Sequence, residues 1–167
     1  MFNPQLIHKA IKFAQARHAG QTRKVSGDEY FQHPIEASYI CANFKKSKHM
    51  DVLIAALILH DTVEDTETTF EELLSEFGMF VASLVFELTD DKLMKEKLGK
   101  FEYQKAKWCG ISNYALFLKL CDRLSNITDS PTETAKSQTK ELLNHISSKR
   151  KLTKSQKEVV KEIRKYI

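Results

Sequence analysis

Residues 51–61, with the sequence DVLIAALILHD, decide the fold of this chain. The eight residues 52–59 are all apolar, so no polar stripe marks a solvent face. Such a segment is expected to form a helix buried on all sides, with Asp51 as its N-cap. The helix ends at His60 and Asp61, so two titratable groups stand at the end of a buried element. We expect the rest of the chain to pack around this helix.

Helical patterns cover most of the remaining sequence. Asn3 with Pro4 predicts the start of a first helix, which Gly20 ends, and Pro34 predicts the start of a second. Further helices are predicted at residues 69–78, 79–88, 92–108, 113–127, 132–147 and 153–166. Alternating strand patterns are missing from the sequence. The predicted fold is therefore a single all-α domain over residues 1–167, a bundle of seven or eight helices.

The composition excludes several classes of protein. With 42% hydrophobic and 29% charged residues, the chain is not expected to be disordered. Its longest apolar run is far shorter than the roughly twenty residues of a membrane-spanning helix. Three cysteines, Cys41, Cys109 and Cys121, are odd in number and far apart, which favours reduced thiols over disulfides or a zinc site. We expect a soluble cytoplasmic protein with no membrane partner.

The net charge of +4 is concentrated at the C-terminal end of the sequence. Residues 131–167 hold ten Lys/Arg and four Asp/Glu, and the lysines recur at helical intervals. This spacing is more typical of a solvated helix face than of a nucleic-acid surface. We therefore expect no nucleic-acid partner.

Two strongly apolar segments carry ionisable residues that are costly to bury alone. One ends in His60, and the other, residues 116–124, contains Asp122. Taken singly, His60 is compatible with a hydrogen-bonded core histidine, and Asp122 with an ion pair to Arg123 or Lys119. However, Lys119, Asp122 and Asn126 lie three and four residues apart, on one helix face. That face is suited to polar contacts with a ligand.

Imidazole and carboxylate donors together predict a site for a divalent cation, with manganese, iron and zinc as the candidates. The predicted ligands are His33, His60, Asp61 and Asp122. Four protein ligands leave positions for water and substrate, as a catalytic metal requires. Glu64 and Asp65 follow Asp61 closely and could orient or deprotonate the water, although an acidic loop before a helix would look the same.

Several segments occur in the order and spacing of the Rel/SpoT-type HD hydrolase domain. They are RKVSGDEYFQHP (23–34), LILHDTVEDTETTFEEL (57–73), LTDDK (88–92) and KLCDRLSN (119–126). Over residues 6–129 the chain resembles a stand-alone small alarmone hydrolase such as the metazoan SpoT homologue, and basic helices follow at 132–166. The resemblance implies a helical fold and hydrolysis of the 3′-pyrophosphate of (p)ppGpp to GDP or GTP plus pyrophosphate.

The resemblance also implies roles for individual residues. It makes the four predicted ligands the holders of Mn²⁺, with zinc or another transition metal able to occupy the site in a purified sample. It makes Glu64 and Asp65 the residues that handle the catalytic water. The nucleotide contacts that it implies are Arg23, Lys24, Tyr30, Asn126 and Lys119, the last of which supports either the Asp122 carboxylate or a phosphate.

Two departures from the family pattern leave the substrate open. The loop carries an extra Val25, and Glu29 stands where proline is common; after Asn126 the usual arginine is missing. (p)ppApp or another 3′-phosphorylated nucleotide therefore remains an alternative substrate. Two further functions also stay open, a nucleotidase for ordinary nucleoside phosphates and a nucleotide sensor without turnover. Each of these functions makes a small-molecule nucleotide the partner, and the sequence assigns no oligomeric state.

Overall fold

The structure is a computed structural model, and it describes residues 2–23, 27–129 and 131–167. The chain forms two compact units, Met1–Thr89 and Asp90–Ile167. The described residues form ten helices and no strand beyond an isolated antiparallel bridge between Thr22 and Glu29. The all-α prediction is confirmed, with short extra helices adding to the number expected. The assignment of residues 1–167 to one domain stays a prediction.

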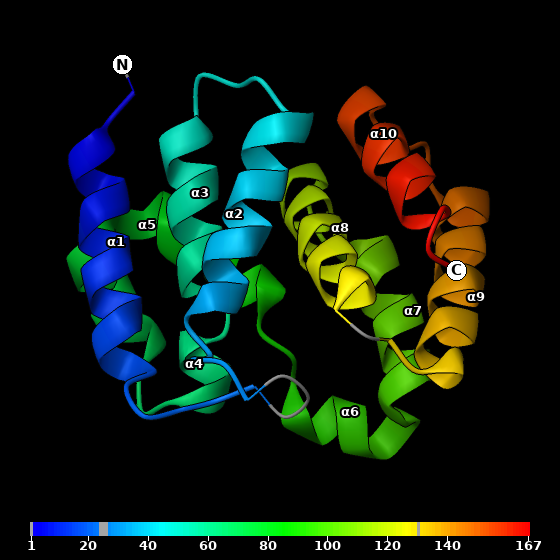
Figure 1. Ribbon diagram of the computed structural model, residues 1–167, viewed down its shortest axis with the longest axis horizontal. Helices are drawn as coiled ribbons and strands as arrows, with labels where there is room; N and C mark the ends of the chain where they lie inside the picture. The colour runs from blue at the N-terminus through cyan, green and yellow to red at the C-terminus, as the bar shows by residue number, and fades with distance from the viewer. Residues whose placement is uncertain (1, 24–26, 130) are drawn as a thin grey trace. The chain divides into compact units, whose positions relative to one another are not determined.

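The first unit is built around the apolar segment 52–59. Its helices are α1 (Pro4–Arg17), α2 (Gln32–Phe44), α3 (Met50–Leu59), α4 (Thr62–Asp65) and α5 (Phe70–Leu88). Helices α1, α2 and α5 all pack on α3 (Figure 1). Residues 55–60 are fully buried or nearly so, whereas Val52 and Ile54 keep some exposure. The central position predicted for this helix is confirmed, and it places His60 at the buried end of α3.

The helix caps of this unit match the sequence patterns in part. The Asn3 side chain accepts hydrogen bonds from the amides of Gln5 and Leu6, as predicted. Asp51, in contrast, does not cap α3, because the helix already begins at Met50. Its carboxylate accepts a hydrogen bond from the Asn3 amide at 3.1 Å instead, which ties the start of α1 to the start of α3.

Two glycines interrupt helical segments. Gly78 has φ 77° and ψ 168° inside α5, so the predicted break between residues 69–78 and 79–88 is confirmed. Gly99 has φ 80° and ψ 146° and divides the segment predicted as one helix from Lys92 to Trp108. A side chain with a Cβ rarely adopts this backbone conformation. The prediction of one continuous helix there was therefore wrong.

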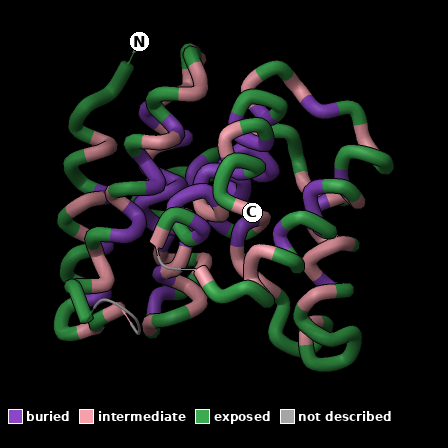
Figure 2. Tube along the Cα trace, turned by 45° about the vertical axis from the view of Figure 1, so that its right-hand side comes forward, coloured by how far each residue is buried: buried purple, intermediate pink, exposed green. Residues whose placement is uncertain are grey.

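The second unit contains α6 (Lys92–Leu98), α7 (Lys100–Gly110), α8 (Asn113–Thr128), α9 (Glu133–Lys149) and α10 (Lys154–Ile163). Helix α8 packs on α10, and α7 packs on α6 and α9. The side chains of Ser112, Thr132 and Thr153 cap α8, α9 and α10 by accepting backbone hydrogen bonds at the helix starts. Buried and exposed stretches alternate along most helices, as amphipathic packing requires (Figure 2).

The three cysteines form no disulfide in the structure, and Cys41 and Cys121 are buried. Within the described part of the chain, no helix combines the length and apolar character needed to cross a membrane.

Candidate active site

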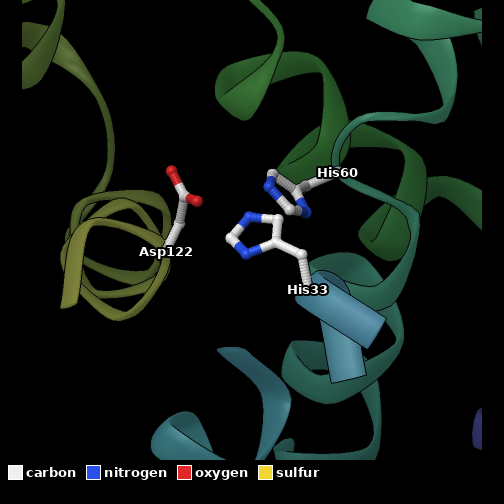
Figure 3. Close-up of side chains that lie close together, drawn as sticks. All are labelled: His33, His60 and Asp122. Atoms are coloured by element: carbon white, nitrogen blue, oxygen red, sulfur yellow. The ribbon is translucent and has the colours of Figure 1, made fainter. Parts of the chain in front are cut away.

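Two buried imidazoles form the centre of the candidate site in the first unit. His33 lies in the first turn of α2 and His60 follows the last residue of α3, and their side chains are 4% and 2% exposed. The ring centroids are 5.6 Å apart with the planes at 61°, and Figure 3 shows the two rings beside one another. The packing of α2 on α3 therefore brings together two histidines that are 27 positions apart in the sequence.

Hydrogen bonding determines which nitrogen of His60 is available to a ligand. Nδ1 lies 2.7 Å from the backbone carbonyl oxygen of Leu57, which can only accept a hydrogen bond. In the neutral ring the proton is therefore on Nδ1, and Nε2 presents a lone pair. This nitrogen lies 3.0 Å from Oδ2 of Asp61. A lone pair and a carboxylate oxygen at this distance repel one another unless a proton or a cation lies between them.

The carboxylate of Asp61 is oriented by a second residue. The hydroxyl of Tyr30 donates a hydrogen bond to Oδ2 of Asp61, and the Tyr30 ring lies 6.2 Å from the ring of His33. Tyr30, predicted to contact the nucleotide, thus contacts one of the predicted metal ligands. Support of this kind is typical of metal sites, where the groups around the ligands fix their orientation.

The donor set of this unit fits a divalent cation of the first transition row. Two neutral imidazoles and one carboxylate are nitrogen and oxygen donors of the type that manganese, iron and zinc accept. The Nδ1 bond of His60 to a backbone carbonyl is the usual way in which a metal-binding histidine is held. The donor types of His33, His60 and Asp61 and the orientation of the His60 ring are therefore those expected for binding a divalent cation.

The two acidic residues assigned to the catalytic water lie on the single turn α4. Glu64 is partly exposed and Asp65 is exposed, three and four residues after Asp61. The turn is closed by hydrogen bonds from the Asp65 amide to the Asp61 carbonyl and from the Thr66 amide to the Thr62 carbonyl. The Asp65 carbonyl accepts a further hydrogen bond, at 2.9 Å, from Nε2 of Gln21.

In the second unit, α8 carries Asp122, the fourth predicted ligand, which is also labelled in Figure 3. The side-chain amide of Asn126, one turn later, donates hydrogen bonds to Oδ1 of Asp122 at 2.7 Å and to its backbone carbonyl at 3.1 Å. Asn126, predicted to face the ribose, therefore orients the Asp122 carboxylate. The neighbouring Arg123 contacts other residues. Its guanidinium lies over the Trp108 ring and donates a hydrogen bond to the hydroxyl of Thr139.

Lys119 is buried, and its charge acts on Asp90. Burial by itself raises the pKa of Asp90. The nearby ammonium groups of Lys119, Lys95 and Lys107 outweigh this effect and hold the pKa below its usual value. The Nζ atoms of Lys95 and Lys107 lie 3.0 and 3.3 Å from the Asp90 carboxylate. Lys119 is therefore near enough to Asp90, a residue of the LTDDK segment, for its charge to lower the pKa of that carboxyl.

The remaining predicted nucleotide contacts lie in the loop between α1 and α2. The Arg23 side chain is 14% exposed, and its Nη1 lies 3.7 Å from Oε2 of Glu36 in α2. Backbone hydrogen bonds join Arg23 to Asp28 and to Gly27. Lys24 and the extra Val25 lie outside the described residues.

Sequence reasoning assigned no role to His18, Gln21 or Asp90. His18 and Gln21 are hydrogen-bonded three residues apart at the end of α1, beside Tyr30. In the sequence, only the three-residue spacing of His18 and Gln21 and the LTDDK motif around Asp90 pointed to these residues, and neither feature specifies which residues they contact.

Comparison with known protein families decides where this chain belongs. The HD domain model matches residues 10–148, a region that includes every predicted ligand. The chain belongs to the HD domain family. The curated relatives described below confirm the predicted membership in the Rel/SpoT-type branch of this family.

Three curated relatives illustrate the similarity. Guanosine-3′,5′-bis(diphosphate) 3′-pyrophosphohydrolase MESH1 of Danio rerio is 42% identical over 126 residues, which are 74% of this chain and 68% of that protein. The Homo sapiens protein of the same name is 41% identical over 122 residues, 72% of this chain and 67% of that protein. GTP pyrophosphokinase rsh of Brucella ovis is 37% identical over 131 residues, 75% of this chain but only 17% of the longer relative.

Two solved structures share the fold. A metazoan ortholog of SpoT, reported to hydrolyse ppGpp, aligns with a TM-score of 0.81 and 24% identity over 99% of this chain and 97% of its own. A Listeria monocytogenes protein aligns with a TM-score of 0.64 and 22% identity, covering 84% of this chain and 99% of its own. The predicted HD-type helical fold is confirmed.

Proposed function

We propose that this protein is a metal-dependent hydrolase that removes the 3′-pyrophosphate of guanosine alarmones, giving GDP or GTP and pyrophosphate. The observation that carries the proposal is the adjacent pair of the buried His60 and the partly exposed Asp61, oriented by a backbone carbonyl and by Tyr30. This pair lies in a chain 42% identical to a hydrolase of that name. We place the reaction in the cytoplasm, where reducing conditions suit three cysteines that form no disulfide.

In this proposal Mn²⁺ is held by His33, His60, Asp61 and Asp122. The two histidines support the assignment by their burial, His60 and Asp61 by their hydrogen bonds to Leu57 and from Tyr30, and Asp122 by its orientation through Asn126. Two carboxylates would balance the charge of a divalent ion. Mn²⁺ binds such donors more weakly than zinc does, so metal supply decides which ion occupies a purified sample.

When bound, the cation acts as a Lewis acid and makes a water molecule nucleophilic near neutral pH. Glu64, one turn after Asp61, accepts a proton from the attacking water, and Asp65 orients that water. The water oxygen forms a bond to the 3′-linked phosphorus while the bond from this phosphorus to the ribose 3′-oxygen breaks. The 3′-oxygen takes up a proton, and the water oxygen leaves within pyrophosphate.

The proposed substrate contacts are divided between positively charged and orienting groups. Arg23 and Lys24 contact the nucleotide, because a guanidinium stacks on a purine and an ammonium attracts phosphate. Tyr30 and Asn126 donate hydrogen bonds to the carboxylates of Asp61 and Asp122, respectively. We therefore assign them the positioning of these two carboxylates in addition to contact with the nucleotide. Lys119, assigned to the support of Asp122 or of a phosphate, is buried, and its charge lowers the pKa of Asp90.

The test is product analysis after incubation of the purified protein and Mn²⁺ with ppGpp, and in parallel with ppApp, each with a chelated control. Release of pyrophosphate from ppGpp that stops on chelation supports the proposal. Release from ppApp alone would move the specificity to adenine and implicate the loop that contains Glu29. The absence of metal-dependent product from either nucleotide would refute hydrolysis and favour a sensor or an ordinary nucleotidase.

The ligand assignment of Asp122 has its own test. Asp122→Ala should lose turnover by at least about a hundredfold, because a direct ligand is removed, while the protein remains folded. Glu158→Ala, which removes an exposed carboxylate of α10, is the matched control and should retain parental activity. Parental turnover in folded, metal-loaded Asp122→Ala would show that the assignment is wrong.

A further inference from the structure

A buried histidine at the end of α1 takes no part in the reaction described above. His18 follows the last residue of α1 and is 2% exposed. Its Nδ1 lies 2.8 Å from Oε1 of Gln21. Because Nε2 of the same glutamine donates to the Asp65 carbonyl, the orientation of the Gln21 amide is fixed and Oε1 must accept from His18. The Nδ1 atom of His18 therefore carries the proton.

The other side of the His18 ring packs on the residue that orients Asp61. The ring centroids of His18 and Tyr30 are 4.8 Å apart, with the planes tilted by 39°. The Tyr30 hydroxyl donates to Asp61, as described above. One buried imidazole is thus linked to Asp61 through Tyr30 and to Asp65 through Gln21.

The turn that carries Glu64 and Asp65 needs support of this kind. Helix α4 contains four residues, and a single helical turn is not stable by itself in water. Its last carbonyl groups have no partner within the helix, and the Asp65 carbonyl is one of them. Gln21 satisfies this carbonyl from a different element and so limits the movement of the turn.

We propose that His18 and Gln21 are positioning residues that form a brace, the His18–Gln21 brace, which fixes α4 and its acidic pair relative to Asp61. The proposal rests on the proposed function, since Glu64 and Asp65 are the groups to be positioned. Neither residue of the brace is a catalytic residue. Both act through hydrogen bonds and ring packing on neighbours of the metal site.

Stability does not account for a histidine at this position. Nε2 of His18 is buried and has no hydrogen-bond partner among the described residues. A buried polar atom without a partner destabilises the folded state, which offsets the gain from the Nδ1 hydrogen bond. Phenylalanine would keep the ring against Tyr30 and remove the unpaired nitrogen, so its effect on unfolding should be small. Its effect on catalysis should be large if the brace positions α4.

The experiment compares His18→Phe, Gln21→Met and the double variant with the parent. We expect kcat for ppGpp with saturating Mn²⁺ to fall about 10–100-fold in each single variant, with KM changed less than about threefold. The double variant should be no slower than the slower single variant, because both changes break the same brace. His8→Phe and Gln15→Met replace exposed residues of α1 and are the matched controls, expected to match the parent.

A second measurement does not depend on activity. Hydrogen exchange of the metal-free protein should be faster over residues 60–68 in both single variants and unchanged in both controls. Parental kcat or parental exchange in folded Gln21→Met would overturn the brace, and so would a loss expressed mainly in KM. Gln21 is only partly buried, so this variant decides the question if His18→Phe does not fold. An inactive parent would instead refute the proposed function, and exchange would still test the brace.

Discussion

The hydrogen bond from Tyr30 to Asp61 predicts a specific loss of metal affinity in Tyr30→Phe. The substitution removes the hydroxyl and keeps the ring, which packs between His18 and His33. The fold of the first unit should therefore be retained. What is lost is the group that holds the Asp61 carboxylate in one orientation before the metal binds.

The size of this loss follows from the contact and from its exposure. A hydrogen bond to a charged group contributes about 1.5–3 kcal/mol. The Asp61 side chain is 17% exposed, so water can replace part of the missing bond, and the lower end of that range applies. About 1.5 kcal/mol corresponds to a roughly tenfold increase in the dissociation constant for Mn²⁺.

Calorimetric titration of Mn²⁺ into the metal-free protein, without nucleotide, measures this constant directly. Tyr39→Phe is the matched control, because the Tyr39 side chain on α2 is 68% exposed, and it should bind Mn²⁺ as the parent does. Equal affinity in Tyr30→Phe and the parent would refute the reasoning. A defect seen only when ppGpp is present would make Tyr30 a substrate contact instead.

Two further predictions concern stability in the two units. Burial raises the pKa of Asp90, but Lys119, Lys95 and Lys107 outweigh this effect and hold the pKa below its usual value. The stabilisation from the Asp90 charge is therefore fully present at pH values above the unfolded-state pKa of about 3.9, and it is lost as the pH falls through the lower folded-state pKa. Asp90→Asn should therefore cost about 3 kcal/mol at pH 7 by urea unfolding and progressively less in strong acid, and a variant as stable as the parent at pH 7 would contradict the assignment. Gly78→Ala should lower the free energy of unfolding by about 1–3 kcal/mol, because alanine must adopt φ near 77° there; an unchanged urea midpoint would argue against that backbone conformation.

The fold class and much of the helix pattern could be predicted because they depend on short-range chemistry. An uninterrupted apolar run identified α3, and the caps at Asn3, Thr132 and Thr153 bond to amides within three residues of the cap itself. Helical hydrogen bonds join residues four apart, so the sequence carries the information that these elements need. The His60-Asp61 pair was evident for the same reason, since it directly follows an apolar run.

Tertiary structure decided which side chains are partners. Asp51 was predicted to cap its own helix and instead accepts from Asn3, 48 positions away. Lys119 acts on Asp90, and Gln21 reaches Asp65 from the end of another helix. The sequence near each of these groups does not specify its partner, which was chosen when helix packing brought distant groups together. By itself the sequence determined most of the helices and the types of side chain at the candidate site, and only the packing of α1 and α2 on α3 decided how the first unit orients those side chains.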